Sequence, residues 1–377
     1  MRILYFSRSY TTHDHRFLSA MVLSGHDIYY LRLIDERHES ISTLPMPSRV
    51  KMVEWTNKEP YPVHLLTMLP DFERVIADVR PDLIQAGPVQ SCGFITALSG
   101  FHPFLLMSWG SDIMVDSDKN DVWNWITRYT LQGSDGLLCD CASVRSKVMS
   151  LVDYHNPIAQ FPWGIDVNAF YPGVSSLNKR HMMGWANAHV LLSTRSLEPI
   201  YNTVTLLAAF KKAHYSDSRL RLIMLGDGSL AQDINQYIID NDLDDLIYRP
   251  GRVPYQQLPD YFREADTYIS CAESDGSSVS LLEALGTGLP VIVADNECNR
   301  EWVTDDNGFL APFANSDIFA EMILRAVNPS KTDLALFATH SRALIREKAN
   351  WDNNVLRLFD AYEILDLAYS TKFLFTQ

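Results

Sequence analysis

Short apolar runs that alternate with helix-length segments constrain the fold of this 377-residue chain more than any other feature. The run RILYFS (Arg2–Ser7) is typical of a first strand, and similar runs follow at intervals long enough for a helix. Strands separated in this way pair in parallel through crossover connections of about a dozen residues or more. The alternation therefore predicts an α/β fold whose parallel sheets are covered by helices on both faces.

The alternation occurs twice, because a second series begins after FYPGVSSLNKR with the strand candidate HVLLSTR and a helix from about Thr203 that Asn202 caps. We place the boundary near residues 168–178 and predict two doubly wound, Rossmann-like domains with a cleft between the carboxyl ends of their strands. The predicted domains are residues 1–170 and residues 171–348. A helical segment, residues 349–377, is expected to cover either domain and can cross back to the N-terminal one.

The formal net charge of −14 argues against a nucleic-acid partner, because phosphate binding requires a surplus of Lys and Arg. The opening MRILYFSRS lacks the long apolar core of a signal peptide. The apolar region FITALSGFHPFLLMSW is interrupted by Gly100, His102 and Pro103, so we predict no transmembrane segment. The expected location is the cytoplasm.

Five cysteines are scattered through mostly apolar surroundings. Cys139 and Cys141 are one residue apart, which is not the C-x-x-C spacing of a zinc or redox site. We therefore expect buried free thiols in a reducing compartment. The five are Cys92, Cys139, Cys141, Cys271 and Cys298.

The stretch SDGSSVSLLEALGTGLPVI (Ser274–Ile292) is the strongest candidate for a functional site. It joins the strand candidates TYISCA and LPVIVAD through a helix, and together they form one βαβ unit. Gly276, Ser277 and Ser278 are expected at the N-terminus of that helix, where unpaired backbone N–H groups and the helix dipole favour phosphate.

Two carboxylates accompany this helix. Asp275 directly precedes it, and Glu283 lies roughly 8 Å along its axis at about 1.5 Å per residue. That separation is similar to the distance from a diphosphate to its ribose, whose vicinal hydroxyls suit a carboxylate. The same residue types also suit a capped helix with Glu283 as a solvated surface acid, and spacing alone leaves both interpretations open.

The run DGSSVSLLEALGTGLPVI resembles the signature of retaining glycosyltransferases of family 4, in which two glutamates with seven residues between them precede A-x-A/G-x-G-x-P-V-I. FPWGIDVNAFYP resembles the family's Asn-Gly-Val-Asp, Phe, Pro element, and RLIMLGDGSL is similar to its strand ending in G-x-G. YRPGRVPYQQLPDYFREADTYIS and NGFLAPFANSDIFAEMI resemble later segments. The resemblance covers nearly the whole chain and is strongest from about residue 161 onward.

This resemblance implies the GT-B fold of two facing Rossmann-like domains. It implies transfer of a sugar, with retention, from a nucleoside diphosphate sugar to a hydroxyl of a sugar, lipid-linked or small-molecule acceptor. UDP is the preferred nucleotide, and glycan or polysaccharide biosynthesis is the expected pathway. Family members work without a bound metal, so no metal and no cofactor beyond the donor co-substrate are expected.

Residue by residue, the resemblance places Asp275 at the donor sugar, Glu283 on the ribose and Arg195 on the diphosphate, with Asp275 and Arg195 as catalytic residues. Asp275 replaces a glutamate and so reaches about one methylene less far. Tyr201 occupies the position of an expected lysine, and Gly251–Val253 lies near the base. The implied donor-binding set is Glu283, Gly276, Ser277, Ser278, Val279, Tyr201, Arg252 and Val253.

On the acceptor side, W-G-S-D resembles the family's H-G-x-D, with Trp109 in place of the histidine. An indole N–H can only donate a hydrogen bond, so either Trp109 stacks a sugar or other groups carry the acceptor chemistry. A polar run in the loop after the first strand is expected at the same cleft. The predicted acceptor-side residues are His13, Asp14, Arg16, Trp109 and Asp112.

Two alternative functions remain open. The same fold and acid pair can serve a nucleotide-sugar epimerase or hydrolase, whose product is an unlinked sugar. The missing lysine and histidine also allow a non-catalytic protein that binds a nucleotide sugar without turnover.

Overall fold

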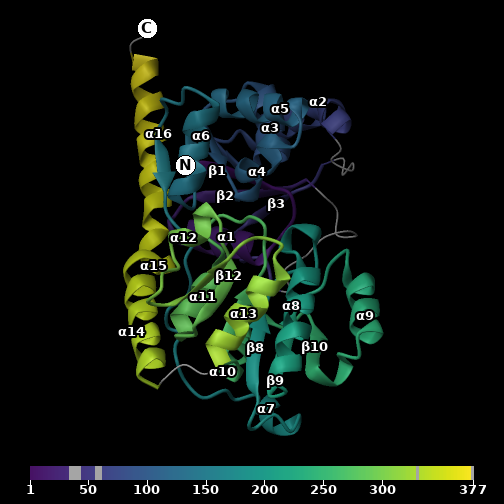
Figure 1. Cartoon of the computed structure of the whole chain (residues 1–377). Coiled ribbons are helices and arrows are strands. Elements are labelled where there is room, and N and C mark those ends of the chain that lie inside the picture. Colours follow the sequence, from purple (N-terminus) through teal and green to yellow (C-terminus); the bar gives the residue numbers. More distant parts are fainter. Residues whose placement is uncertain (34–43, 56–61, 328–330, 375–377) are drawn as a thin grey trace. The chain divides into compact units, whose positions relative to one another are not determined.

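The computed structural model describes residues 1–33, 44–55, 62–327 and 331–374, and the chain divides into two compact units. The first unit comprises Met1–Pro162 and Asn353–Gln377, and the second comprises Trp163–Asp352. Each unit is built around a parallel sheet that helices cover (Figure 1). The predicted α/β class with two Rossmann-like sheets is confirmed.

The described strands of the first unit form a parallel sheet in the order β3-β2-β1-β4-β5-β6-β7. Strands β4, β5 and β6 are buried along their whole length, which explains why they occur as continuous apolar runs. The order reverses between β1 and β4, and ligands bind in such sheets at the carboxyl ends of the strands beside that reversal. The strands are β1 (Arg2–Ser7), β2 (Asp27–Arg32), β3 (Lys51–Val53), β4 (Leu83–Ala86), β5 (Phe104–Met107), β6 (Gly136–Cys139) and β7 (Ile158–Gln160).

The last helix of the chain, α16 (Leu356–Leu374), runs beside β6 and β7 (Figure 1). The buried Tyr362 hydroxyl on α16 donates to Gln85 Oε1 in β4, and Tyr369 donates to Asp135. These bonds fasten the end of the chain to the first sheet. The other helices of this unit are α1 (Thr12–Leu23), α2 (Pro62–Val79), α3 (Phe94–Ser99), α4 (Ser111–Met114), α5 (Asp121–Gln132) and α6 (Ala142–Leu151).

The described strands of the second unit form a parallel sheet in the order β10-β9-β8-β11-β12-β13. This is the strand order of the Rossmann fold, and it reverses between β8 and β11. The strands are β8 (His189–Ser193), β9 (Leu220–Leu225), β10 (Ile247–Gly251), β11 (Thr267–Ser270), β12 (Val291–Ala294) and β13 (Gly308–Ala311).

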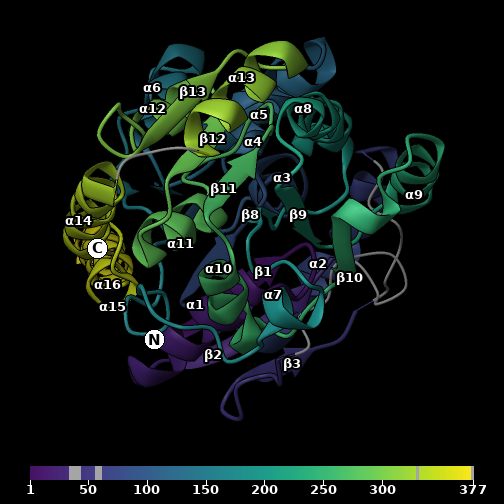
Figure 2. The same ribbon diagram turned by 60° about the horizontal axis from the view of Figure 1, so that its bottom comes forward.

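Alternate side chains of the second sheet supply two separate cores. Leu191 packs in a cluster with residues of α8 and α13, whereas Val190 and Leu192 pack in a cluster with residues of α10, α11 and α14. Figure 2 shows α8 and α13 on one side of this sheet and α10 and α11 on the other. The helices are α7 (Lys179–Met182), α8 (Thr203–Ser216), α9 (Ala231–Asp240), α10 (Leu258–Glu264), α11 (Val279–Thr287), α12 (Glu297–Arg300), α13 (Ser316–Val327), α14 (Lys331–Lys348) and α15 (Trp351–Asn354).

Two local predictions are wrong. The polar run after β1 is the first turn of α1 and not a loop, because Thr11 and Asp14 form a reciprocal capping box that starts the helix there. Helix α8 does begin at Thr203, but Asn202 has a left-handed backbone and its side chain makes no capping bond. It accepts a hydrogen bond from the Thr205 hydroxyl instead, at 3.0 Å.

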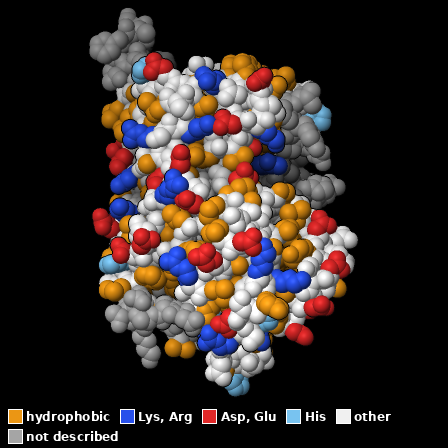
Figure 3. Space-filling model, viewed as in Figure 1, with side chains coloured by type: hydrophobic (Ala, Val, Ile, Leu, Met, Phe, Trp, Pro, Cys, Tyr) orange, Lys and Arg blue, Asp and Glu red, His pale blue; other side chains and the backbone are white. Residues whose placement is uncertain are grey.

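The surface and the cysteines agree with the composition. All five cysteines lie within the described residues, where they are buried and free, as predicted. No helix in the described part of the chain is long and apolar enough to span a bilayer. On the face seen in Figure 3, Lys and Arg side chains are interspersed with Asp and Glu side chains.

Candidate functional site

Two loops of the second unit meet beside the point where its strand order reverses. Arg195 follows β8, and Asp275 and Ser278 lie between β11 and α11. The Arg195 and Asp275 side chains form an ion pair, with 2.6 Å between Nη2 and Oδ2. The structure therefore brings together two predicted catalytic residues at the position where open α/β sheets bind ligands.

The Arg195 guanidinium is held from several sides. Its Nη1 donates to the hydroxyls of Ser278 and Ser280, at 2.8 and 2.9 Å. Its carbon lies 4.1 Å from the centroid of the Tyr201 ring, which places the ring where a cation–π contact forms. The residue at the position of the expected lysine thus orients Arg195 and adds no second charge.

Burial and neighbouring charge act in opposite directions on this cation. Burial lowers the pKa of the Arg195 guanidinium, but Asp275 and the Tyr201 and Tyr268 hydroxyls raise it, and the net shift is upward. The side chains of Arg195 and Asp275 are 11% and 23% exposed. A charge removed from water to this degree is stable only when it is paired, so Asp275 keeps Arg195 ionised in place.

The N-terminus of α11 is open to an anion. Ser278 is the N-cap, but its hydroxyl contacts Arg195 and makes no hydrogen bond to the first N–H groups of the helix. Gly276 and Ser277 precede it, as predicted, and Val279 is the first helical residue. The unpaired N–H groups of the first turn point along the axis beside Arg195, so positive charge and donors converge there.

Glu283 lies within α11 and is 3% exposed. It follows Val279 by four residues, which is about 6 Å along the helix axis. The interpretation of Glu283 as a solvated surface acid is therefore wrong. A carboxylate buried this far requires polar partners, and Glu283 does interact within the described structure.

The loop after β9 fixes the Arg195 loop through a close backbone approach. Gly226 has a φ of +111°, and a Cβ at this position would lie 2.6 Å from the Arg195 carbonyl oxygen. The Leu197 N–H donates to the Asp227 carbonyl at 3.1 Å. The glycine of the G-D-G motif is thus needed for the approach of two backbones that positions Arg195.

Arg252 and Val253 lie at the carboxyl end of β10, where the Gly226 N–H donates to the Gly251 carbonyl at 3.0 Å. Strand β9 separates β10 from β8, so these two residues stand one strand away from the Arg195 loop. Arg252 is exposed.

The first unit has a pocket of about 270 Å³ beside its own strand-order reversal, formed by the loops after β1, β4 and β5. Four of the five predicted acceptor-side residues line it, namely His13, Asp14, Trp109 and Asp112. Of the described residues, Arg16 is not part of this lining and lies on α1. The sequence did not predict the other seven lining residues, which are Ser7, Arg8, Ser9, Thr11, Pro88, Ser111 and Asp116.

Two aspartates of this pocket are used by the protein itself. Asp112 accepts hydrogen bonds from the Ser108 hydroxyl at 2.7 Å and from the backbone N–H groups of Trp109 and Val89 at 3.0 and 3.1 Å. Asp14 accepts from the Thr11 N–H at 2.8 Å and from the Tyr5 hydroxyl at 3.0 Å. Burial raises the pKa of both carboxyls, and these hydrogen bonds oppose the shift.

Asp112 therefore ties the loops after β4 and β5 together. The loops after β4 and β5 can lie this close only because residue 87 is glycine. A Cβ on Gly87 would overlap the Met107 carbonyl group at the end of β5. The close approach of these two strand ends sets the backbone of Trp109.

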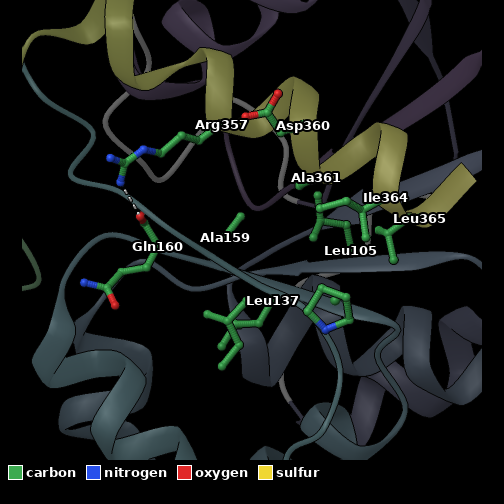
Figure 4. Close-up of a pocket in the computed structure, with 12 residues that line it drawn as sticks. Leu105, Leu137, Ala159, Gln160, Arg357, Asp360, Ala361, Ile364 and Leu365 are labelled. Carbon is green, nitrogen blue, oxygen red and sulfur yellow. Dashed lines mark hydrogen bonds between the residues drawn. The ribbon is translucent and has the colours of Figure 1, made fainter. Parts of the chain in front are cut away.

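A second cavity, of about 240 Å³, lies between α16 and strands β5 to β7 (Figure 4). Its walls are mostly aliphatic, with Leu137 and Ile364 among them, and Arg357 Nη1 donates to the Gln160 carbonyl at 3.0 Å at its edge. It lies away from the reversal between β1 and β4, so we assign it to the packing of α16.

In the described part of the chain, no group of three His, Cys, Asp or Glu side chains is placed to hold a metal ion.

Comparisons with known proteins match both units. Residues 184–336 match the family described as glycosyl transferases group 1, and residues 2–141 match glycosyl transferase 4-like. Alpha-monoglucosyldiacylglycerol synthase of Streptococcus pneumoniae is 24% identical over 188 residues, which cover 48% of this chain and 42% of that protein.

The GtfA subunit of UDP-N-acetylglucosamine–peptide N-acetylglucosaminyltransferase of Streptococcus agalactiae is 24% identical over 241 residues, or 63% of this chain and 44% of that protein. The chain thus spans less than half the length of these two relatives. HepE of Anabaena, solved with UDP-glucose, has a TM-score of 0.80 at 16% identity and covers 97% of this chain and 100% of its own. That likeness shows a common fold.

Proposed function

The chain belongs to the group 1 glycosyltransferases and has the GT-B fold, and on this premise we propose that it transfers the sugar of a UDP-sugar donor to a hydroxyl group in glycan biosynthesis. The observation that carries the proposal is the buried Arg195 guanidinium beside the open N-terminus of α11. UDP is the proposed nucleotide because the Streptococcus agalactiae relative is named for UDP-N-acetylglucosamine and HepE was solved with UDP-glucose.

The donor binds in this proposal by an exchange of partners. Arg195 is paired with Asp275, and a diphosphate carries more negative charge and more acceptor oxygens than one carboxylate. The diphosphate therefore takes the guanidinium and the first-turn N–H groups of α11. Asp275 is released to accept hydrogen bonds from hydroxyls of the donor sugar.

The remaining donor-binding residues are proposed from their places around this centre. Glu283 binds the ribose hydroxyls, about one helical turn beyond the first open N–H group at Val279. Tyr201 keeps the guanidinium in its orientation through the ring contact. Arg252 and Val253, one strand away, lie towards the base.

The proposed reaction retains the configuration at the anomeric carbon. The bond from that carbon to the diphosphate oxygen breaks, and Arg195 and the α11 terminus stabilise the charge that develops on the leaving group. The acceptor oxygen bonds to the same face of the carbon, and its proton passes to the departing diphosphate oxygen. The cation and the helix terminus supply the charge compensation, so the proposal includes no metal and no cofactor.

The pocket of the first unit is the proposed acceptor site, because four predicted acceptor-side residues line it. A cytoplasmic location belongs to the same proposal. It is supported by the free thiols of all five cysteines, which a reducing compartment preserves.

Calorimetric titration of UDP, GDP and ADP into the protein without added metal tests the donor assignment. We expect UDP to bind, and we expect Arg195→Lys and Glu283→Gln to weaken binding about tenfold or more while the protein stays folded. Arg219→Lys is the matched control, since Arg219 is an exposed arginine paired with Asp217. Folded protein that binds none of the three nucleotides would contradict the proposal. In a separate turnover assay, a product that is only unlinked sugar would favour hydrolysis.

A further inference from the structure

The third aspartate of the pocket in the first unit differs from the other two. Asp116 lines the pocket and is half-buried, yet no described residue donates a hydrogen bond to its carboxylate. Asp14 and Asp112 are both saturated by donors of the protein. A half-buried carboxylate without donors keeps its full hydrogen-bonding capacity for a ligand.

The charges around Asp116 favour its ionised form against burial. Burial raises the pKa of the Asp116 carboxyl, and the positive charges of Lys119 and Arg8 oppose that shift. Arg8 is exposed and lines the same pocket. The buried Asp112 carboxyl lies close enough for the Asp116 charge to raise its pKa as well.

Trp109 supplies an aromatic ring of fixed position to the same pocket. Its ring is half-buried, with its centroid 6.4 Å from that of Phe17 in an edge-to-face arrangement and 5.8 Å from that of His13. Its backbone N–H donates to Asp112. The indole therefore needs little ordering when a ligand arrives.

An aromatic ring and an open carboxylate in one polar pocket match a pyranose. A sugar ring has an apolar face of C–H groups that packs on an indole, and it has vicinal hydroxyls that donate side by side to a carboxylate. A lipid with a single alcohol group lacks vicinal hydroxyls. A serine or threonine side chain of a peptide lacks the apolar ring face.

We propose that this pocket binds a sugar ring of the acceptor, with Trp109 as its stacking surface and Asp116 as the acceptor of hydrogen bonds from its hydroxyls. The inference rests on the proposed transfer function, and it narrows the acceptor from any hydroxyl compound to a carbohydrate. A free glycoside and a lipid-linked sugar present the same ring, so the proposed pocket can bind an acceptor from either source.

Saturation-transfer NMR on the full chain tests this binding in the presence of UDP. The probes are methyl glycosides of glucose, galactose, mannose and N-acetylglucosamine, with glycerol, dioctanoylglycerol and a serine-containing peptide as non-sugar probes. We expect at least one glycoside to bind. We expect Trp109→Leu to weaken that binding about tenfold and Asp116→Asn about fivefold.

Matched controls lie nearby on α5. Trp125→Leu removes an exposed indole and Asp121→Asn an exposed carboxylate, and neither residue lines the pocket, so both variants should bind the glycoside as the unmodified chain does. Glycoside binding that both pocket variants leave unchanged would overturn the inference, as would binding of non-sugar probes alone.

The outcome also separates the two proposals. Retained UDP binding with no glycoside binding overturns the sugar acceptor and leaves the donor assignment standing. Loss of both in folded protein overturns the transfer function itself. A lipid-linked form of the bound sugar that binds more tightly than the methyl glycoside would identify the lipid-linked source.

Discussion

The two sheets reverse their strand order in the same way, but they leave the polar groups at that position in different states. In the second unit, Arg195 and Asp275 form an ion pair, so their charges offset each other. In the first unit, Asp14 and Asp112 are saturated by the backbone and by hydroxyls, and Asp116 is left open. In the proposed reaction the second site exchanges partners to bind its ligand, whereas Asp116 of the first site needs no such exchange.

This difference teaches how one topology can serve two kinds of ligand. A charged ligand such as a diphosphate can displace an internal carboxylate, because it returns a stronger charge-assisted interaction. A neutral ligand forms no such charge-assisted interaction. Its site therefore needs polar groups that are held in place but form no hydrogen bonds within the protein. Partial burial of a charged group costs desolvation free energy. The Arg195–Asp275 ion pair offsets that cost within the protein, whereas Asp116 offsets part of it through nearby positive charges.

Removing the cation of the second site should have the largest effect. Arg195→Ala removes the partner of the diphosphate and leaves Asp275 without its ion pair, so turnover should fall by about a hundredfold or more. The free energy of unfolding should fall by about 3 kcal/mol. Steady-state kinetics and urea denaturation measure the two. A variant with full stability would mean that the ion pair seen here is not a structural requirement.

Removing Asp112, one of the two saturated aspartates of the first site, should affect stability more than catalysis. Asp112→Ala leaves the N–H groups of Val89 and Trp109 and the Ser108 hydroxyl without their acceptor, and the free energy of unfolding should fall by about 3 kcal/mol. Asp116→Ala, four residues later, removes no such bond and should change it by less than about 0.5 kcal/mol. Denaturant titration of both variants checks the contrast. Equal losses would erase the distinction between saturated and open carboxylates.

Neutralising the anion of the second site should separate binding from turnover. Asp275→Asn removes the charge that competes with the diphosphate for Arg195, so UDP should bind about threefold to tenfold more tightly. Turnover should fall, because the donor sugar loses its carboxylate. Calorimetry and kinetics on one preparation test both signs, and weaker UDP binding would argue against the exchange of partners.

The pH dependence of acceptor use should give the smallest effect. Burial raises the pKa of Asp116, with Lys119 and Arg8 in opposition, and the ionised form is the stronger acceptor of hydrogen bonds. The acceptor KM should therefore rise severalfold as pH falls through that raised pKa, and it should stay constant above it. The same profile measured on Asp116→Asn should lack this rise. Its persistence would assign the titration to another group.

The fold could be predicted because its signals are local. Strands that are buried on both faces appear as continuous apolar runs, and β1 occurs at Arg2–Ser7 as predicted. The N-terminus of α11 was also readable from Gly276 to Ser278, since small and capping residues there precede an apolar helix. The capping box of Thr11 and Asp14 carries a sequence signal too, which the prediction of a loop overlooked.

Contacts between distant loops could not be predicted in this way. Nothing in the residues near Arg195 indicates that Asp275 is its partner, because the parallel sheet alone brings β8 and β11 side by side. Asp112 and Asp116 look alike in sequence, and only the approach of the β4 and β5 ends decides which one is saturated. The burial of Glu283 likewise depends on what packs around α11.

The return of the chain to its first unit sets an order for folding during synthesis. The second unit is one continuous stretch, Trp163–Asp352, whereas the first also needs α16, which follows the second unit in the chain. Until then the buried partner of Gln85, Tyr362, is missing and the aliphatic faces of β6 and β7 lack their cover. The first unit is therefore begun before the second but completed after it.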